Sequence, residues 1–78
     1  MSVLAVDLSR WIDDVGGMDV AATLLGEKYR TVRSWYYLDR APTAKAAGRI
    51  VKTAAGKLDY NGIYAPYVAA ISAREGAA

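Results

Sequence analysis

Helical periodicity, interrupted at short intervals by glycine and proline, is the feature that most constrains this chain. Apolar residues recur at spacings of three and four, the pattern of an amphipathic helix, in residues 3–15, 18–25, 27–38 and 44–54. Between these segments stand residues that commonly end or begin helices: Gly16-Gly17, Gly26, Pro42 and Gly56. The sequence therefore predicts an all-α fold, a small bundle of four to five short helices.

The first two segments are expected to pack through their apolar stripes. A helix from about Val3 to Val15 would be capped by the hydroxyl of Ser2 and ended by the paired glycines. A second helix of about two turns would follow, from Met18 to Leu25. Its pattern predicts four buried side chains, Val20, Ala21, Leu24 and Leu25.

The third segment, residues 27–38, is apolar on one side and basic on the other. Helical spacing groups on the apolar side Tyr29, Val32, Trp35 and Tyr36. On or near the other side it groups Lys28, Arg30, Arg33 and Ser34. Tyr36 and Tyr37 are adjacent and cannot both face inward, so one packs and the other contacts solvent or a partner. The segment predicts a helix from about Tyr29 to Tyr37 with one buried and one cationic face.

After Pro42 a fourth helix of about thirteen residues is expected, closed by Gly56, with its buried stripe at Ala44, Ala47, Ile50, Val51 and Ala54. Asn61-Gly62 is compatible with a tight hairpin turn or an irregular loop. Pro66 suits the first turn of a last helix, so a loop followed by a helix is the preferred interpretation. We expect a helical domain over residues 1–60 and an extension over residues 61–78 that packs on it or forms a dimer interface.

Basic charge is concentrated in the middle of the chain. Eight of the ten lysines and arginines lie between residues 27 and 57, where only Glu27 and Asp39 oppose them. Both ends are mildly acidic. A cationic segment that coincides with a surface helix favours an anionic partner such as nucleic acid.

Several function classes are disfavoured by what the 78 residues contain. There is no cysteine and no histidine, no glycine-rich phosphate loop, and the adjacent Asp13 and Asp14 point in different directions on a helix. We therefore expect a protein that is not an enzyme and needs no cofactor or metal ion. No stretch approaches the roughly 20 apolar residues of a membrane span, which favours a soluble cytoplasmic protein.

A helix-turn-helix needs a small residue where its two helices touch, a turn residue that tolerates left-handed dihedral angles, and apolar anchors on the second helix. The residues that fill these roles are Ala22, Gly26, Val32 and Trp35. With the turn and recognition helix at about residues 18–37, the chain resembles the Cro-like repressors of temperate phages and related short antitoxin-type regulators. It keeps their Gly26, Thr31, Val32 and Trp35. It departs from them at Glu27, where the family has an aliphatic residue, and at Lys28, where it has serine.

The resemblance implies which side chains would contact double-stranded DNA. Those expected to read bases in the major groove are Tyr29, Arg30, Arg33 and Ser34. Those expected near the sugar-phosphate backbone are Lys28, Thr31, Tyr37, Arg40 and Lys45. The implied function is a phage or prophage repressor that binds an operator as a homodimer and occludes a promoter. Two alternatives stay open: an architectural DNA-binding protein of the excisionase or packaging type, and an antitoxin or other protein-interaction module.

Overall fold

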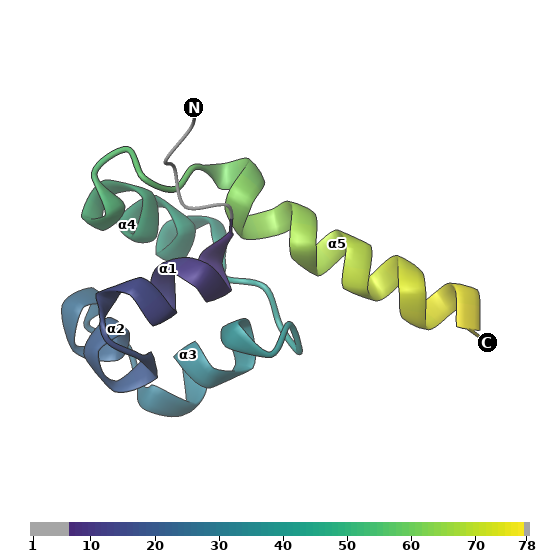
Figure 1. Cartoon of the computed structure of the whole chain (residues 1–78), viewed down its shortest axis with the longest axis horizontal. Helices are drawn as coiled ribbons and strands as arrows, with labels where there is room; N and C mark the ends of the chain where they lie inside the picture. Colours follow the sequence, from purple (N-terminus) through teal and green to yellow (C-terminus); the bar gives the residue numbers. More distant parts are fainter. Residues whose placement is uncertain (1–6, 78) are drawn as a thin grey trace.

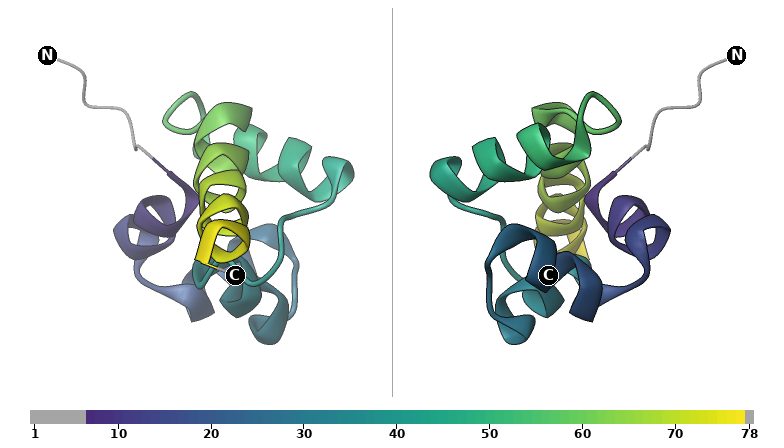
Figure 2. Two further views of the ribbon diagram at one scale, coloured as in Figure 1. Left: turned by 90° about the vertical axis from the view of Figure 1, so that its right-hand side faces the viewer. Right: turned by 90° about the vertical axis from the view of Figure 1, so that its left-hand side faces the viewer.

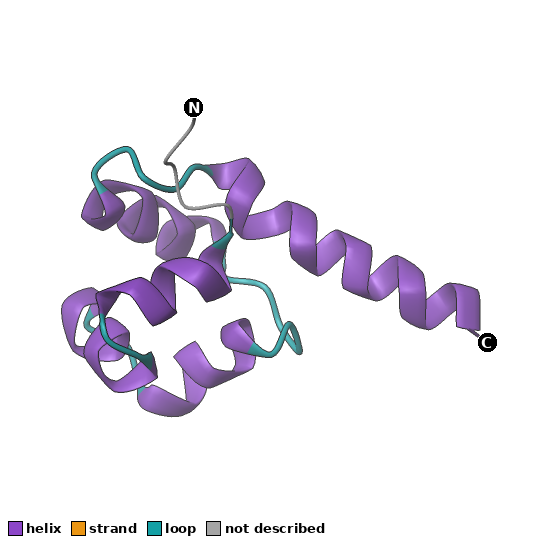
Figure 3. Ribbon diagram, in the orientation of Figure 1, coloured by secondary structure: helices purple, strands orange, loops and turns teal. Residues whose placement is uncertain are grey.

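The computed structural model describes residues 7–77, which form five α-helices and no β-strand (Figures 1 and 3). The helices are α1 (Leu8–Val15), α2 (Met18–Leu25), α3 (Tyr29–Tyr36), α4 (Ala44–Ala54) and α5 (Tyr60–Ala77). The predicted all-α bundle is confirmed, and the number of helices in the described residues is the upper value expected.

The first helix begins later than its apolar pattern indicates. Asp7 has an extended backbone, and its carboxylate accepts a hydrogen bond from the Arg10 amide at 2.8 Å, so Asp7 is the N-cap of α1. The predicted start at Val3 is therefore wrong, because Asp7 interrupts the helix that would run through it. The predicted cap at Ser2 lies outside the described residues.

The pair α2 and α3 forms the helix-turn-helix, and α1 packs against both helices. Gly26 closes α2 in the left-handed conformation, with φ of 67°, as the turn requires. Ala21, Ala22 and Leu25 are buried. Val20 and Leu24, predicted to be buried, are instead 40% and 52% exposed. The reason is that α2 buries a narrow stripe, and these two side chains lie beyond its edges.

Helix α4 completes the core from the opposite side of the bundle. The Thr43 hydroxyl accepts a hydrogen bond from the Ala46 amide at 3.2 Å and caps the helix. The helix has eleven residues, and Ala55 ends it in the left-handed conformation before Gly56. Its buried side chains are Ala46, Ala47, Ile50 and Ala54. Of the predicted stripe, Val51 is half-buried and Ala44 is exposed, because Ala44 lies on the first turn, to one side of the stripe.

Helix α5 differs most from the sequence expectation. Asp59 accepts a hydrogen bond from the Gly62 amide at 2.8 Å, which starts the helix at Tyr60. Asn61 and Gly62 are therefore helical, which rules out both the hairpin turn and the irregular loop. Pro66 lies inside the helix, and the expectation that it begins the helix is wrong. The cap at Asp59 precedes Pro66 by two turns and already fixes the helical direction of the chain.

The first part of α5 supplies its contact with the hydrophobic core. Ile63 is buried in the core, and the Tyr64 hydroxyl donates a hydrogen bond to the Pro42 carbonyl at 2.8 Å. Beyond Pro66 the helix extends away from the other helices (Figure 1), and an end-on view shows it leaving the bundle with α1 and α4 to either side (Figure 2). Near its end, Arg74 donates a hydrogen bond to the Leu38 carbonyl at 2.7 Å. The predicted boundary at residues 60 and 61 thus falls inside α5.

Candidate nucleic-acid interface

The two faces of α3 differ sharply in burial. Val32 and Trp35 are 0% and 4% exposed and fix the helix to the core. Tyr29, Arg30 and Arg33 lie on the opposite, exposed face. Tyr29 is 46% exposed, so its placement by sequence on the apolar side is wrong, whereas its exposure matches the position expected of a base-reading residue. Three of the four predicted base-reading side chains therefore share one accessible surface.

Arg33 is supported by a neighbouring aromatic ring. Its guanidinium carbon lies 5.2 Å from the centre of the Tyr37 ring, a cation–π contact one helical turn away. The Tyr37 ring in turn meets Tyr36 edge-on, with 5.0 Å between ring centres. These contacts limit the conformations of the Arg33 side chain and leave the edge of its guanidinium available for hydrogen bonds. Less conformational entropy is then lost when Arg33 binds a partner.

Ser34 is less available than its place in the sequence indicates. Its hydroxyl donates a hydrogen bond to the Thr31 carbonyl at 2.7 Å, and the side chain is half-buried. A serine inside a helix commonly bonds back to the preceding turn in this way. The Ser34 oxygen retains the capacity to accept a hydrogen bond. Of the predicted base-reading residues, Ser34 is the one whose donor is already used within the protein.

Tyr36 links α3 to α1, which settles which of the two adjacent tyrosines packs. Its hydroxyl donates to the carboxylate of Asp13, with oxygen distances of 3.0 and 3.2 Å, and its backbone carbonyl accepts from the Ser9 hydroxyl at 2.8 Å. Tyr37 is 53% exposed and faces outward. The hydrogen bond to Asp13, with a smaller contribution from burial, raises the pKa of Tyr36 because both disfavour the phenolate.

This contact predicts a pH effect on stability. The pKa of Tyr36 is higher in the folded than in the unfolded chain, so its contribution is complete below pH 10, the ordinary tyrosine value, and is lost as pH rises through the folded pKa. In an ultraviolet titration of tyrosine ionisation, the highest-pH component should disappear in Tyr36→Phe and shift downward in Asp13→Asn. The matched control is Asp14→Asn, because Asp14 pairs with Arg10 instead. An unchanged titration in Asp13→Asn would contradict the assignment.

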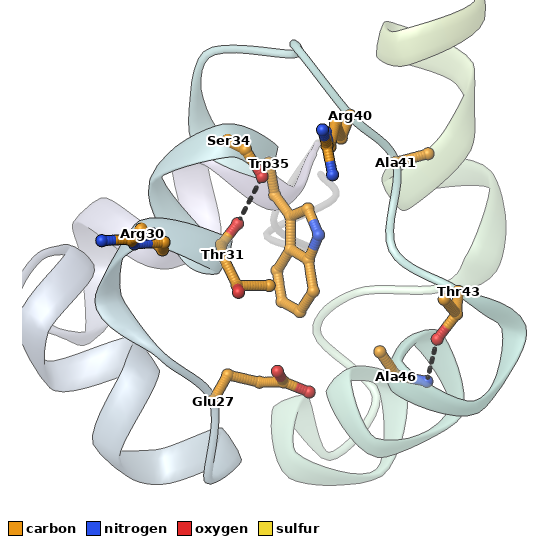
Figure 4. Close-up of a pocket in the computed structure, with 9 residues that line it drawn as sticks. All are labelled: Glu27, Arg30, Thr31, Ser34, Trp35, Arg40, Ala41, Thr43 and Ala46. Atoms are coloured by element: carbon orange, nitrogen blue, oxygen red, sulfur yellow. Dashed lines mark hydrogen bonds between the residues drawn. The ribbon is translucent and has the colours of Figure 1, made fainter.

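A cavity of about 470 Å³ lies between α3, the loop that follows it, and the start of α4 (Figure 4). Trp35 and Thr31 form its α3 wall, and Arg40 and Thr43 come from the loop and the cap of α4. Arg30 contributes to the rim, but its side chain points away from the cavity in Figure 4. At the other end lies Glu27. This arrangement groups a cation and several hydrogen-bond donors around one opening beside α3.

Glu27 has a structural role that explains its presence at the turn. Its carboxylate forms an ion pair with Arg49 of α4, and the Glu27 side chain is only 18% exposed. The contact joins the turn before α3 to α4 and offsets the negative charge of the carboxylate. Sequence patterns missed this pair, because residues 22 apart reveal no partnership by spacing.

The predicted backbone-contacting residues fall into separate places around α3. Lys28 is the exposed N-cap residue of α3 and forms no side-chain capping bond. Thr31 and Arg40 line the cavity, Tyr37 lies beside Arg33, and Lys45 is exposed on the first turn of α4. Thr43 was not among the predicted site residues. Its signal in the sequence is a threonine directly before an alanine-rich helix, which is a typical N-cap position.

Comparisons with family models, with characterised proteins and with solved structures found no match to this chain. Within the described residues, no group of three or more carboxylates is placed to hold a metal ion, and none of the helices is both long and apolar enough to cross a membrane.

Proposed function

We propose that this protein is a sequence-specific DNA-binding regulator that inserts α3 into the major groove. One observation carries the proposal: α3 is fixed from behind by Val32 and Trp35, while Arg30 and Arg33 lie on its exposed face. The major groove of B-DNA accepts one α-helix, and an arginine can donate two hydrogen bonds to O6 and N7 of guanine. A rigid helix with exposed arginines suits that task.

The surrounding cations support the same proposal. Lys28 and Arg40 stand at either end of α3, and Lys45 is exposed at the start of α4. Cations in these positions would lie toward the phosphate strands that flank the groove and would release counterions on binding. Resemblance of the turn to Cro-like repressors favours a homodimer on an operator that occludes a promoter, in the cytoplasm of a bacterium or a phage-infected host.

A salt titration tests the proposal. Fluorescence anisotropy would compare the full chain on duplexes selected from a randomised library and on random duplexes, over roughly 50 to 300 mM salt. We expect preference for the selected sequence and an affinity that falls steeply with salt, because several phosphates are neutralised per subunit.

Other outcomes would replace the proposal. Cooperative spreading without a footprint of defined size would favour an architectural protein. No DNA binding, together with a protein partner that stays bound at high salt, would favour an interaction module.

A further inference from the structure

The cavity beside α3 presents hydrogen-bond donors from three separate parts of the chain. Figure 4 shows the guanidinium of Arg40 above the indole of Trp35, whose nitrogen is directed into the space between α3 and α4. Thr43 stands on the opposite wall. Its oxygen accepts from the Ala46 amide, so its own hydroxyl hydrogen remains free to be donated. Donors that converge on one space favour an oxygen-rich anion.

Trp35 supplies the most informative of these donors. The residue is 4% exposed, yet no hydrogen bond among the described residues uses its indole N–H. Within that part of the chain, no fully enclosed side-chain nitrogen or oxygen lacks a partner, so this nitrogen must stay open to the cavity. An indole N–H normally finds a hydrogen-bond acceptor when the ring that carries it is buried. Here the position left for that acceptor is the cavity itself.

The charge around the cavity is uneven. Glu27 lies at the end away from Arg40, and its carboxylate is paired with Arg49. The end formed by Arg40, Trp35 and Thr43 is therefore the cationic end. An anion held at that end would face Arg40 and the indole N–H and would lie away from the Glu27 carboxylate, which is paired with Arg49.

We propose that this cationic end receives one backbone phosphate of the bound DNA, held by the Arg40 guanidinium, the Trp35 indole N–H and the Thr43 hydroxyl. The inference rests on the proposed DNA-binding function and adds a fixed anchor to it. Phosphate contacts set the register of a protein on the duplex, whereas base contacts specify sequence. Trp35 would thus join the core to the DNA backbone and determine how α3 enters the groove.

A pair of substitutions at Thr43 isolates the anchor from the fold. Asparagine and aspartate both serve as N-caps, so Thr43→Asn and Thr43→Asp should preserve α4. Only aspartate adds a negative charge beside the phosphate. We expect Thr43→Asp to bind selected and random duplexes about tenfold more weakly than Thr43→Asn, at an equal or higher melting temperature. Equal affinities of the two variants would overturn the proposal.

A second measurement locates the phosphate without relying on Thr43. Neutral methylphosphonate linkages would be placed one at a time along the selected duplex. Trp35→Phe keeps an aromatic ring but removes the N–H, and loss of a hydrogen bond to a charged group should weaken binding about tenfold. That penalty, and the penalty of Arg40→Gln, should vanish at one and the same methylphosphonate position. If both penalties persist at every position, no phosphate occupies the cavity.

Two further results distinguish the sources of failure. If the wild type binds no duplex in the salt titration, the proposed function itself fails. A free phosphate ion as the true ligand would raise the melting temperature of the wild type more than chloride of equal ionic strength, and Thr43→Asp would abolish that rise. Together with mutant penalties that persist at every methylphosphonate position, this second result would overturn the assignment to DNA.

Discussion

Replacing Arg33 with alanine is expected to weaken binding to a selected duplex by about 10- to 100-fold, the range that one two-pronged arginine–guanine contact contributes. Arg33 is exposed on α3 and held against the Tyr37 ring, so its guanidinium is aimed before DNA arrives. On random duplexes the loss should be only a few-fold, because there Arg33 acts as a single positive charge. Anisotropy on the two duplexes measures both effects.

Arg33→Lys separates the charge from the hydrogen-bonding geometry. Lysine keeps the positive charge but has no planar fork, so binding to random DNA should persist while preference for the selected sequence falls. Arg10→Ala serves as the matched control, since Arg10 is an exposed arginine on α1 that pairs with Asp14. If Arg33→Ala weakens binding to both duplexes equally, Arg33 contacts only phosphate. The exposed face of α3 would then not be the surface that reads bases.

The helix-turn-helix could be predicted because its requirements are local. Gly26 takes the left-handed conformation that a turn between two packed helices needs, and Val32 and Trp35 recur at helical spacing. Burial follows this spacing closely on α3. The spacing fails where a residue lies at the edge of the stripe, as Tyr29 and Leu24 do. At those positions the neighbouring helices, not the pattern, decide which side chain is covered.

The ends of α1 and α5 could not be placed by pattern because capping overrode it. Apolar spacing continues through residue 4 and Pro66 suits a first turn, but the carboxylates of Asp7 and Asp59 each accept an amide three residues ahead. An aspartate that satisfies a free amide fixes the helix start at that point. The sequence also contains aspartates that cap no helix, and its pattern does not show which aspartates will act as caps.

The cavity could not be predicted because the chain must reverse to form it. After α3, Leu38 takes a positive φ of 62° and the loop brings Arg40 and Thr43 back beside Trp35. A non-glycine residue in that conformation is uncommon and carries no clear sequence signal. The resemblance to Cro-like repressors predicts Arg40 near the DNA backbone, but the position of Arg40 beside the indole depends on this turn.

Replacing Ile63 with alanine is expected to destabilise the whole domain by about 2 to 4 kcal/mol, because the substitution leaves a cavity where an isoleucine was packed. Ile63 is 2% exposed and belongs to the same core as Ile12 and Ile50. Val68 is the matched control on the same helix, since it is 57% exposed. Val68→Ala should change stability by no more than about 0.5 kcal/mol.

Urea unfolding followed by circular dichroism measures both variants, with one cooperative transition expected in each. If Ile63→Ala and Val68→Ala have equal stabilities, the first turn of α5 adds nothing to the core. The expected difference would mean that residues 1–60 lack part of their own core when α5 is absent. Deletion of residues 61–78 would then unfold the domain, and a resulting loss of DNA binding would report that unfolding rather than a lost dimer interface. Whether α5 also mediates dimerisation must therefore be tested with substitutions beyond Pro66, where the helix extends from the bundle.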